Sequence, residues 1–125
     1  MNMLGKPVSF IAIVRAKESR DFYENTLSLT CLSEDAYSMV FDLGETVLRI
    51  QKVDSLPGIN HTVLGWEVDD IQKVVSELRE RGVVFEEFSQ LSQNAFGIWH
   101  APSGAKVAWF KDPDGNTLSL TQLAT

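Results

Sequence analysis

Hydrophobic and polar residues alternate most regularly near the carboxyl end of the chain. Between residues 105 and 122, the run AKVAWFK is followed by DPDG and then by the alternating stretch NTLSLTQ. Asp112, Pro113 and Gly115 are the residue types that favour the first, second and fourth positions of a type I turn. Two short extended runs joined by such a turn predict an antiparallel β-hairpin.

The first half of the chain predicts a strand, a helix and three more strands. Val8–Val14 is short and rich in β-branched and aromatic residues, which is typical of a buried strand. Between Ala16 and Leu27 the apolar residues recur at helical spacing, with charged residues on the other side. Three more extended runs follow, with polar turns between them: Leu29–Ser33, Tyr37–Asp42 and Thr46–Val53.

The same order of elements begins again after residues 54–60. That segment contains Ser, Pro and Gly without periodicity, so we interpret it as a linker. Thr62–Val68 is predicted to be the next strand. A helix follows, because apolar residues at i, i+3, i+4 and i+7, starting from Ile71, form one stripe. Either Asp69 or Asp70 is a candidate cap for its first turn.

Gly82 is expected to end this second helix, and Val83–Phe88 is predicted to be the strand after it. The hairpin supplies the last two strands, so the second half is also βαβββ. Compared with the first half it holds extra residues, which we place in an insertion at 89–104; such long irregular segments are either functional or merely mobile. We therefore expect one domain over residues 1–125, with a first module at 8–53, a linker at 54–60 and a second module at 61–122.

Composition limits the class of protein more than it changes this fold. The chain has 125 residues, of which 44% are hydrophobic, and this fits one globular domain. A formal net charge of −6 disfavours nucleic acid and an anionic membrane as partners, because those associations need a basic surface. Cys31 is the only cysteine, so no internal disulfide is expected, and a cytoplasmic location fits.

Three stretches of sequence carry a family likeness. They are Phe22–Leu27 (FYENTL) in the first predicted helix, Trp66–Asp70 (WEVDD) before the second, and Trp109–Asn116 (WFKDPDGN) around the hairpin turn. With the internal repeat, they make the chain resemble the vicinal oxygen chelate superfamily over Val8 to Gln122. That superfamily includes glyoxalase I, extradiol dioxygenases, fosfomycin-resistance enzymes and bleomycin-resistance proteins.

The resemblance implies an α+β fold of the glyoxalase/bleomycin resistance/dioxygenase type. In that fold two βαβββ modules form one incurved mixed sheet around a cup, where metal and substrate bind. The resemblance also implies a homodimer, and it leaves open whether the modules are exchanged between subunits.

Superfamily members that use a metal carry His on the first strand of each module and Glu or a similar ligand on the fourth. The resemblance places the corresponding positions of this chain at Ser9, at Arg49 or Gln51, at Val63 and at Ser119. None of these is a usual metal ligand. The resemblance therefore implies no metal at the usual place.

Alternation along the strands predicts which side chains share a face of the sheet. The face that the helices cover is expected to hold Phe10, Ala12, Val14, Leu48, Ile50, Leu64, Trp66, Val68, Leu118 and Leu120. The opposite face, toward the cup, is expected to hold Ser9, Arg49, Gln51, His61, Val63, Glu67, Thr117, Ser119 and Thr121.

Several side chains are candidate contacts for a ligand in the cup. Trp99 and Trp109 offer aromatic area from the insertion and the hairpin, although Trp109 fits a packed core equally well. Lys106 and Arg49 are candidate cationic groups for an anionic or carbonyl-bearing ligand, whereas the net acidic charge favours a cationic one. The candidate ligand-binding residues are Ser9, Arg49, Gln51, His61, Val63, Trp99, Lys106, Trp109 and Ser119.

A displaced metal centre built from His61, Glu67 and His100 is an alternative to an organic-ligand pocket. A catalytic zinc or iron site takes about three protein ligands from His and carboxylates, and the chain has only 2 histidines. Each of the three residues is also explained as a solvated side chain on a strand or loop.

The expected function is binding of a small organic molecule in the cup, without a metal cofactor, in a protein similar in architecture to bleomycin-resistance proteins. One alternative is a lyase, isomerase or dioxygenase that uses one divalent metal ion held by displaced ligands. The other is a regulatory or interaction module without a small-molecule site. The sequence leaves open which ligand is bound and whether a reaction is catalysed.

Overall fold

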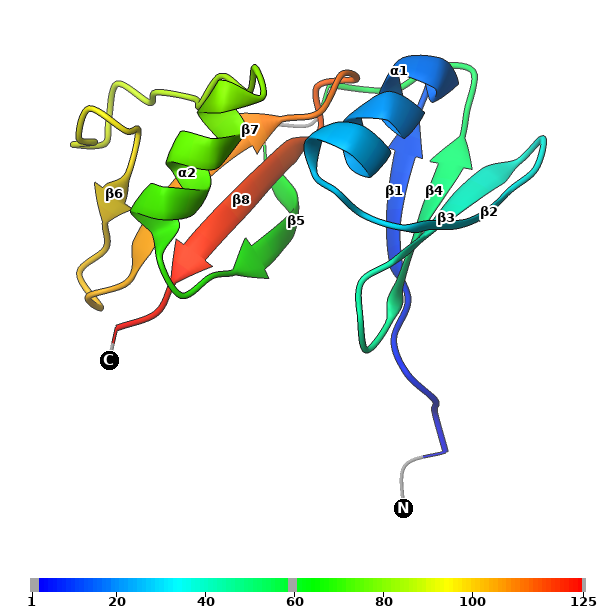
Figure 1. Ribbon diagram of the computed structural model, residues 1–125, viewed down its shortest axis with the longest axis horizontal. Coiled ribbons are helices and arrows are strands. Elements are labelled where there is room, and N and C mark those ends of the chain that lie inside the picture. Colours follow the sequence, from blue (N-terminus) through cyan, green and yellow to red (C-terminus); the bar gives the residue numbers. More distant parts are fainter. Residues whose placement is uncertain (1–2, 59–60, 125) are drawn as a thin grey trace. The chain divides into compact units, whose positions relative to one another are not determined.

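The protein consists of two compact units, Met1–Gly58 and Ile59–Thr125 (Figure 1). The computed structural model describes residues 3–58 and 61–124. Each unit holds one four-stranded mixed sheet with a helix, as the internal repeat predicts. Residues 59 and 60 of the predicted linker lie outside the described residues. No helix among the described residues is long and apolar enough to cross a membrane.

The first unit follows the predicted βαβββ order, and its sheet runs β1-β4-β3-β2. The edge strand β1 is parallel to β4, whereas β3 is antiparallel to both of its neighbours. The bounds are β1 Ser9–Ile13, α1 Ala16–Asp21, the π-helical turn η1 Phe22–Thr26, β2 Cys31–Glu34, β3 Ser38–Asp42 and β4 Val47–Lys52.

The helix predicted between Ala16 and Leu27 is confirmed, with its second half wound as a π-turn. This turn carries Tyr23, whose ring is fully buried and lies 5.9 Å from the ring of Phe41 on β3. Because Phe41 pairs with Leu48, the helix covers the face of the sheet that carries Leu48. We call the other side of each sheet its helix-free face.

The predicted face assignment of β1 is wrong by one residue. Ile11 pairs with Ile50 and is 4% exposed, whereas Phe10 pairs with Arg49 and is 53% exposed. Ser9 therefore shares the helix-covered face with Leu48 and not the face of Arg49. The run VSFIAIV is apolar at every position but Ser9, so its composition alone does not fix which alternate residues point inward.

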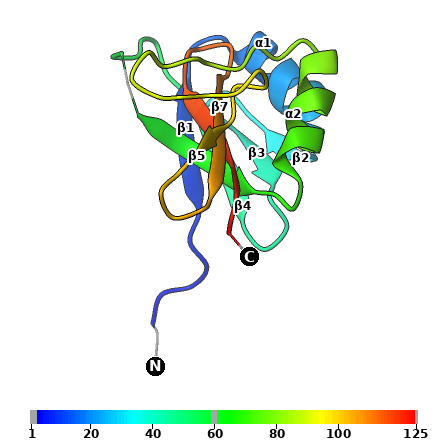
Figure 2. The same ribbon diagram turned by 90° about the vertical axis from the view of Figure 1, so that its left-hand side faces the viewer.

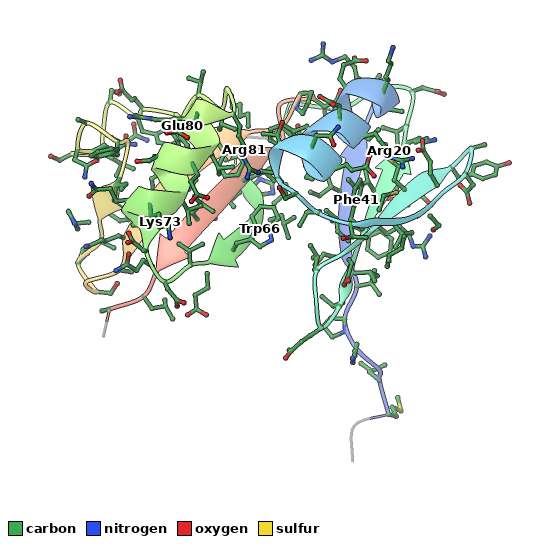
Figure 3. All side chains as sticks on the ribbon, viewed as in Figure 1. Arg20, Phe41, Trp66, Lys73, Glu80 and Arg81 are labelled. Atoms are coloured by element: carbon green, nitrogen blue, oxygen red, sulfur yellow. The ribbon has the colours of Figure 1, made fainter. Side chains whose placement is uncertain are left out.

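A charged network joins the first helix to the sheet. Arg20 on α1 binds Glu34 on β2, and Lys52 on β4 lies with its Nζ 2.7 Å from the second carboxylate oxygen of Glu34 (Figure 3 labels Arg20). The two hydrogen bonds from Lys52 and Arg20 hold the pKa of the Glu34 carboxyl below its usual value.

The second unit has the sheet order β5-β8-β7-β6, with β5 parallel to β8 and the other pairs antiparallel. The inward side chains of β7 and β8, among them Ala108, Phe110 and Leu118, are fully buried, and α2 packs on these two strands. The bounds are β5 Thr62–Glu67, α2 Ile71–Glu80, β6 Trp99–His100, β7 Lys106–Lys111 and β8 Thr117–Gln122.

Of the two candidate caps, Asp70 is the one that caps α2. Its carboxylate accepts a hydrogen bond from the backbone N–H of Lys73 at 3.2 Å, which satisfies one of the unpaired donors of the first turn. Gly82 follows the helix with φ of +93°, as predicted for a residue that ends it.

The hairpin turn is confirmed, and Asp112 organises it. The N–H of Gly115 donates to the carbonyl of Asp112 at 3.0 Å, closing the turn. The buried Asp112 carboxylate also accepts from the N–H of Asp114 and from both the N–H and the side-chain amide of Asn116, at 2.8 to 2.9 Å.

Val83–Phe88 does not form the predicted strand. Only Phe85 makes an isolated bridge, to Phe110 on β7, supported by a hydrogen bond from the Glu86 N–H to the Trp109 carbonyl. The rest of that edge of β7 is paired with β6, which comes from within the predicted insertion 89–104. The insertion therefore divides one edge strand into two short pieces.

The part of the insertion between these two pieces is held together by the side chain of Gln93. Its Oε1 accepts from the N–H of Phe88 at 2.8 Å, and its Nε2 donates to the carbonyls of Glu86 and Gly97 at 2.9 and 2.8 Å. The guanidinium of Arg79 on α2 ties the loop to the helix by donating to the Ala95 carbonyl at 3.0 Å.

The Glu34 network predicts acid-sensitive stability. Because the folded-state pKa of Glu34 lies below its unfolded value of 4.5, its contribution is present above that pH and is lost as the pH falls through the folded-state pKa. Glu34→Gln is expected to lower the free energy of unfolding by up to about 1 kcal/mol at pH 7, since the pair is partly exposed. In urea unfolding, the difference from the wild type should shrink toward pH 3. Exposed Glu45→Gln is the control, and an equal difference at both pH values contradicts the assignment.

Gln93→Leu is expected to loosen the loop. Loss of three hydrogen bonds from a partly buried amide costs roughly 1–3 kcal/mol. Hydrogen exchange followed by NMR should show faster exchange of the Phe88 amide, with the amides of β8 unaffected. Gln72→Leu on the exposed side of α2 is the matched control. Unchanged exchange at Phe88 would show that the Gln93 amide does not hold this segment.

Candidate functional site

A hollow of about 460 Å³ lies on the helix-free side of the second unit. The beginnings of β5 and β8, the end of β7 and the segment after Phe85 supply its walls. Figure 2 shows this segment, green to yellow, crossing above β7 toward the start of β5. The lining residues are His61, Thr62, Phe88, Gln90, Leu91, Trp109, Lys111 and Thr117.

Two aromatic rings form the apolar wall of this hollow. Phe88 stands edge-on to Trp109, with ring centroids 5.3 Å apart and an interplanar angle of 90°. Behind it, Trp99 on β6 lies 6.1 Å from Trp109. Edge-to-face pairs of this kind favour one relative orientation of the two rings, so Phe88 helps to orient the indole of Trp109.

The divided edge strand explains how Phe88 reaches this position. The hydrogen bond from Glu86 to Trp109 keeps the chain beside β7, and the Gln93 amide then holds Phe88 at the point where the segment leaves the sheet. The Leu91 N–H donates to the Phe88 carbonyl at 3.0 Å, which closes a tight turn. The wall of the hollow is thus built by the insertion.

The side chains on the helix-free face form rows across the strands. Thr62 on β5, Thr117 on β8 and Lys111 on β7 are successive partners and make the first row. The next row on that face has Gly65, Ser119 and Trp109. A Cβ on Gly65 would lie 2.3 Å from the Ser119 hydroxyl oxygen, so the glycine leaves room for that hydroxyl beside Trp109.

Among the described residues that line the hollow, only Lys111 carries a formal charge at pH 7, and it is a cation in a protein that is acidic overall. Lys111 and His61 line the hollow, and none of its described lining residues is a carboxylate. Glu86 lies nearby, with its carboxylate 3.6 Å from the Lys111 Nζ; the two side chains are 30% and 51% exposed. Because water screens this pair, it holds Lys111 only weakly.

The structure brings only part of the predicted candidate set to this hollow. His61 and Trp109 line it, and Trp99 contacts Trp109 from behind. Ser119 lies in the second row. Ser9, Arg49 and Gln51 belong to the first unit, where Arg49 and Gln51 share the helix-free face and Arg49 lies 3.3 Å from the Ser38 hydroxyl.

Two candidates are placed differently from the prediction. Lys106 pairs with Gln122 and has the alternation of Ala108 and Phe110, so it is on the helix-covered side and not beside Trp109. Val63 is the extra residue of a β-bulge, because the register passes directly from Thr62 to Leu64. The bulge brings Thr62 to the face where simple alternation predicted His61 and Val63.

The sequence prediction missed most of the hollow. Lys111 could have been found, since it is two residues from Trp109 on the same strand and must share its face. Thr62 depends on the bulge, and Phe88 depends on the divided strand; the sequence pattern signals neither. Thr117 was predicted to face the cup, and the lining residues that the prediction missed are Thr62, Phe88, Gln90, Leu91 and Lys111.

The residues at the four positions inferred for a metal do not fit one. Arg49 is a cation, Gln51 an amide and Val63 a bulged aliphatic residue, while Ser9 lies on the helix-covered face. Ser119 carries only a hydroxyl, which lies over Gly65. Among the described residues, no three of His, Cys, Asp or Glu gather in a metal-binding group. Of the alternative ligand set, His100 on β6 pairs with Lys106 on β7, and Glu67 on β5 pairs with Thr121 on β8.

Comparison with solved structures supports the fold over nearly the whole chain. A bleomycin resistance determinant encoded on the transposon Tn5 is 19% identical with a TM-score of 0.75, covering 98% of this chain and 100% of that one. A glyoxalase family protein from Bacillus anthracis is 15% identical with a TM-score of 0.75, covering 99% and 98%. A lactoylglutathione lyase from Agrobacterium tumefaciens is 13% identical with a TM-score of 0.73, covering 94% and 92%.

A family model gives the assignment that these distant structural matches do not. No curated protein sequence matched the chain. The model for the Glyoxalase/Bleomycin resistance protein/Dioxygenase superfamily, however, matches residues 8–120, which include both βαβββ units. This agrees with the resemblance carried by the two helix motifs and the hairpin turn. The chain therefore belongs to the Glyoxalase/Bleomycin resistance protein/Dioxygenase superfamily.

Proposed function

We propose that the protein binds a small organic molecule in the hollow of its second unit, without a metal cofactor. The observation that carries this proposal is the aromatic wall formed by Trp109 and Phe88. Ligand sites are typically concave, of roughly 300–1,000 Å³, with aromatic walls and a few polar groups that fix orientation. The hollow has each of these properties within the described residues.

The contacts favour a flat ligand. An aromatic ring placed against the half-buried Trp109 would remove apolar area of both rings from water and gain an oriented ring contact. The donors nearby, such as the Thr117 hydroxyl and the Lys111 ammonium, would orient its polar substituent.

The indole of Trp109 should report binding directly. The chain has 3 tryptophans, so its indole N–H signals are readily separated by NMR. We expect addition of indoleacetate, indoleacetamide or tryptamine to shift the Trp109 signal, which the Trp109→Phe variant identifies by its loss. Calorimetry should show about threefold to tenfold weaker binding for Trp109→Phe, because part of an oriented ring contact is lost.

Trp66→Phe is the matched control for this measurement. Trp66 pairs with Leu120 on the helix-covered side of the same sheet, so its replacement should leave probe affinity unchanged. If none of the three compounds shifts the Trp109 signal at millimolar concentration, or if Trp66 is the residue that responds, the hollow is not the binding site.

Metal content tests the competing enzyme class. After incubation with Mn, Fe(II), Ni or Zn followed by desalting, inductively coupled plasma mass spectrometry should find only traces of metal on the protein. The reason is that the candidate positions offer hydroxyl, amide, guanidinium and aliphatic groups, which do not form a tight site for these ions. Retention of near one equivalent of one metal, lost in His61→Ala, would instead support an enzyme with displaced ligands.

A further inference from the structure

We propose that the ligand of this hollow is an aromatic anion, with a carboxylate that lies among Lys111, Thr62 and Thr117 while its ring lies against Trp109. This inference rests on the proposed function and adds the chemical class of the ligand. It follows from the order of the rows on the helix-free face, from the positive charge of Lys111 in the hollow and from the weak ion pair between Lys111 and Glu86.

The two rows divide the hollow into an anion end and a ring end. In the first row, Lys111, Thr117 and Thr62 are cross-strand partners, so an ammonium and two hydroxyls lie side by side. Neighbouring strands lie roughly 4.7–4.9 Å apart, which is close enough for one carboxylate to accept from neighbouring members of the row. All three are hydrogen-bond donors.

The second row supplies the surface for the ring. Of its members Trp109, Ser119 and Gly65, only Trp109 lines the hollow, and the Ser119 hydroxyl occupies the space over Gly65. Phe88 stands edge-on to Trp109 and forms the second aromatic side of this end of the hollow. The first row borders the same hollow beside Trp109, so a substituent on that side of a ring lying on Trp109 would be next to Lys111, two residues along β7.

The charges around the hollow also favour an anionic group at the end near Lys111. Lys111 and His61 line the anion end, and the described lining residues include no carboxylate, in a chain of formal charge −6. Glu67 shares the helix-free face but pairs with Thr121, one row beyond Ser119, on the side away from Lys111. A cationic ligand would have to place its charge next to Lys111 or take Glu86 away from Lys111.

Glu86 is the group that competes with the ligand for Lys111. Its carboxylate is 3.6 Å from the Lys111 Nζ, which is longer than a hydrogen bond, and both side chains are partly exposed. A pair of this kind contributes little to stability. A ligand carboxylate that binds Lys111 together with two hydroxyls can therefore replace it at little cost.

Three compounds of similar size separate the possible ligand charges: indoleacetate, indoleacetamide and tryptamine. Calorimetry and the Trp109 indole signal are measured with each, on the full-length protein. We expect indoleacetate to bind at least fivefold to tenfold more tightly than the other two, since a hydrogen bond to a charged group exceeds one to a neutral group. Lys111→Met should remove most of that preference.

Two further variants sharpen the test. Lys106→Met makes the same charge change on the same strand but on the helix-covered side, and it should keep the preference for the anion. Glu86→Gln removes the competitor of Lys111 and should strengthen indoleacetate binding severalfold while leaving indoleacetamide unchanged. Thermal unfolding of each variant shows that the fold is intact.

The outcomes distinguish this inference from the function on which it rests. Equal affinity for all three compounds, or a preference for tryptamine, overturns the anion assignment. A shift of the Trp109 signal in the same experiments would still support the hollow as the binding site. An anion preference that survives Lys111→Met, or that Lys106→Met abolishes equally, also overturns it. If none of the compounds shifts the Trp109 signal, the proposed function and this inference are both wrong.

Discussion

The alternation of side chains along β7 and β8 is the constraint on which both the core and the hollow of the second unit depend. Phe110 and Leu118 are fully buried on one side, and their neighbours Trp109 and Thr117 therefore line the hollow on the other. A one-residue slip between these strands and the helix would place Trp109 in the core and Phe110 in solvent. The turn organised by Asp112 joins the two strands and fixes their register, so its buried hydrogen bonds also determine the geometry of the hollow.

The insertion divides an edge strand of the second unit and forms part of the wall of the hollow. In the first unit, β2 pairs along β3 as a single piece apart from one irregularity. In the second unit, β7 is paired at one end by Phe85 and at the other by β6. The chain between them leaves the sheet, and the hydrogen bonds of Gln93 compensate for the backbone pairing that a continuous strand would have made. Departure from the sheet is what carries Phe88 to Trp109.

The sequence predicts most of the fold because strands, helices and turns depend on local patterns. The repeat, a helix cap at Asp69 or Asp70 and the Asp112 turn are each predicted from a few neighbouring residues, and of the two aspartates Asp70 is the cap. The failures depend on nonlocal pairing. An almost uniformly apolar strand does not show which alternate residues face the helix, so Phe10 was placed on the wrong side; the bulge at Val63 and the division of Val83–Phe88 are set by the partner strands. Site residues carried by those features were missed for the same reason.

The overall charge of the chain says little about the local charge at the hollow. The formal value of −6 is a sum over the whole sequence, whereas a bound molecule interacts strongly only with groups within about one Debye length, roughly 8–10 Å. Strand register decides which groups those are. Here it puts Lys111 in the row of Thr62 and Thr117 and puts Glu67 two rows away. A protein of net negative charge can therefore have a cation, Lys111, as the charged residue that lines its hollow, with Glu86 as its partly exposed partner.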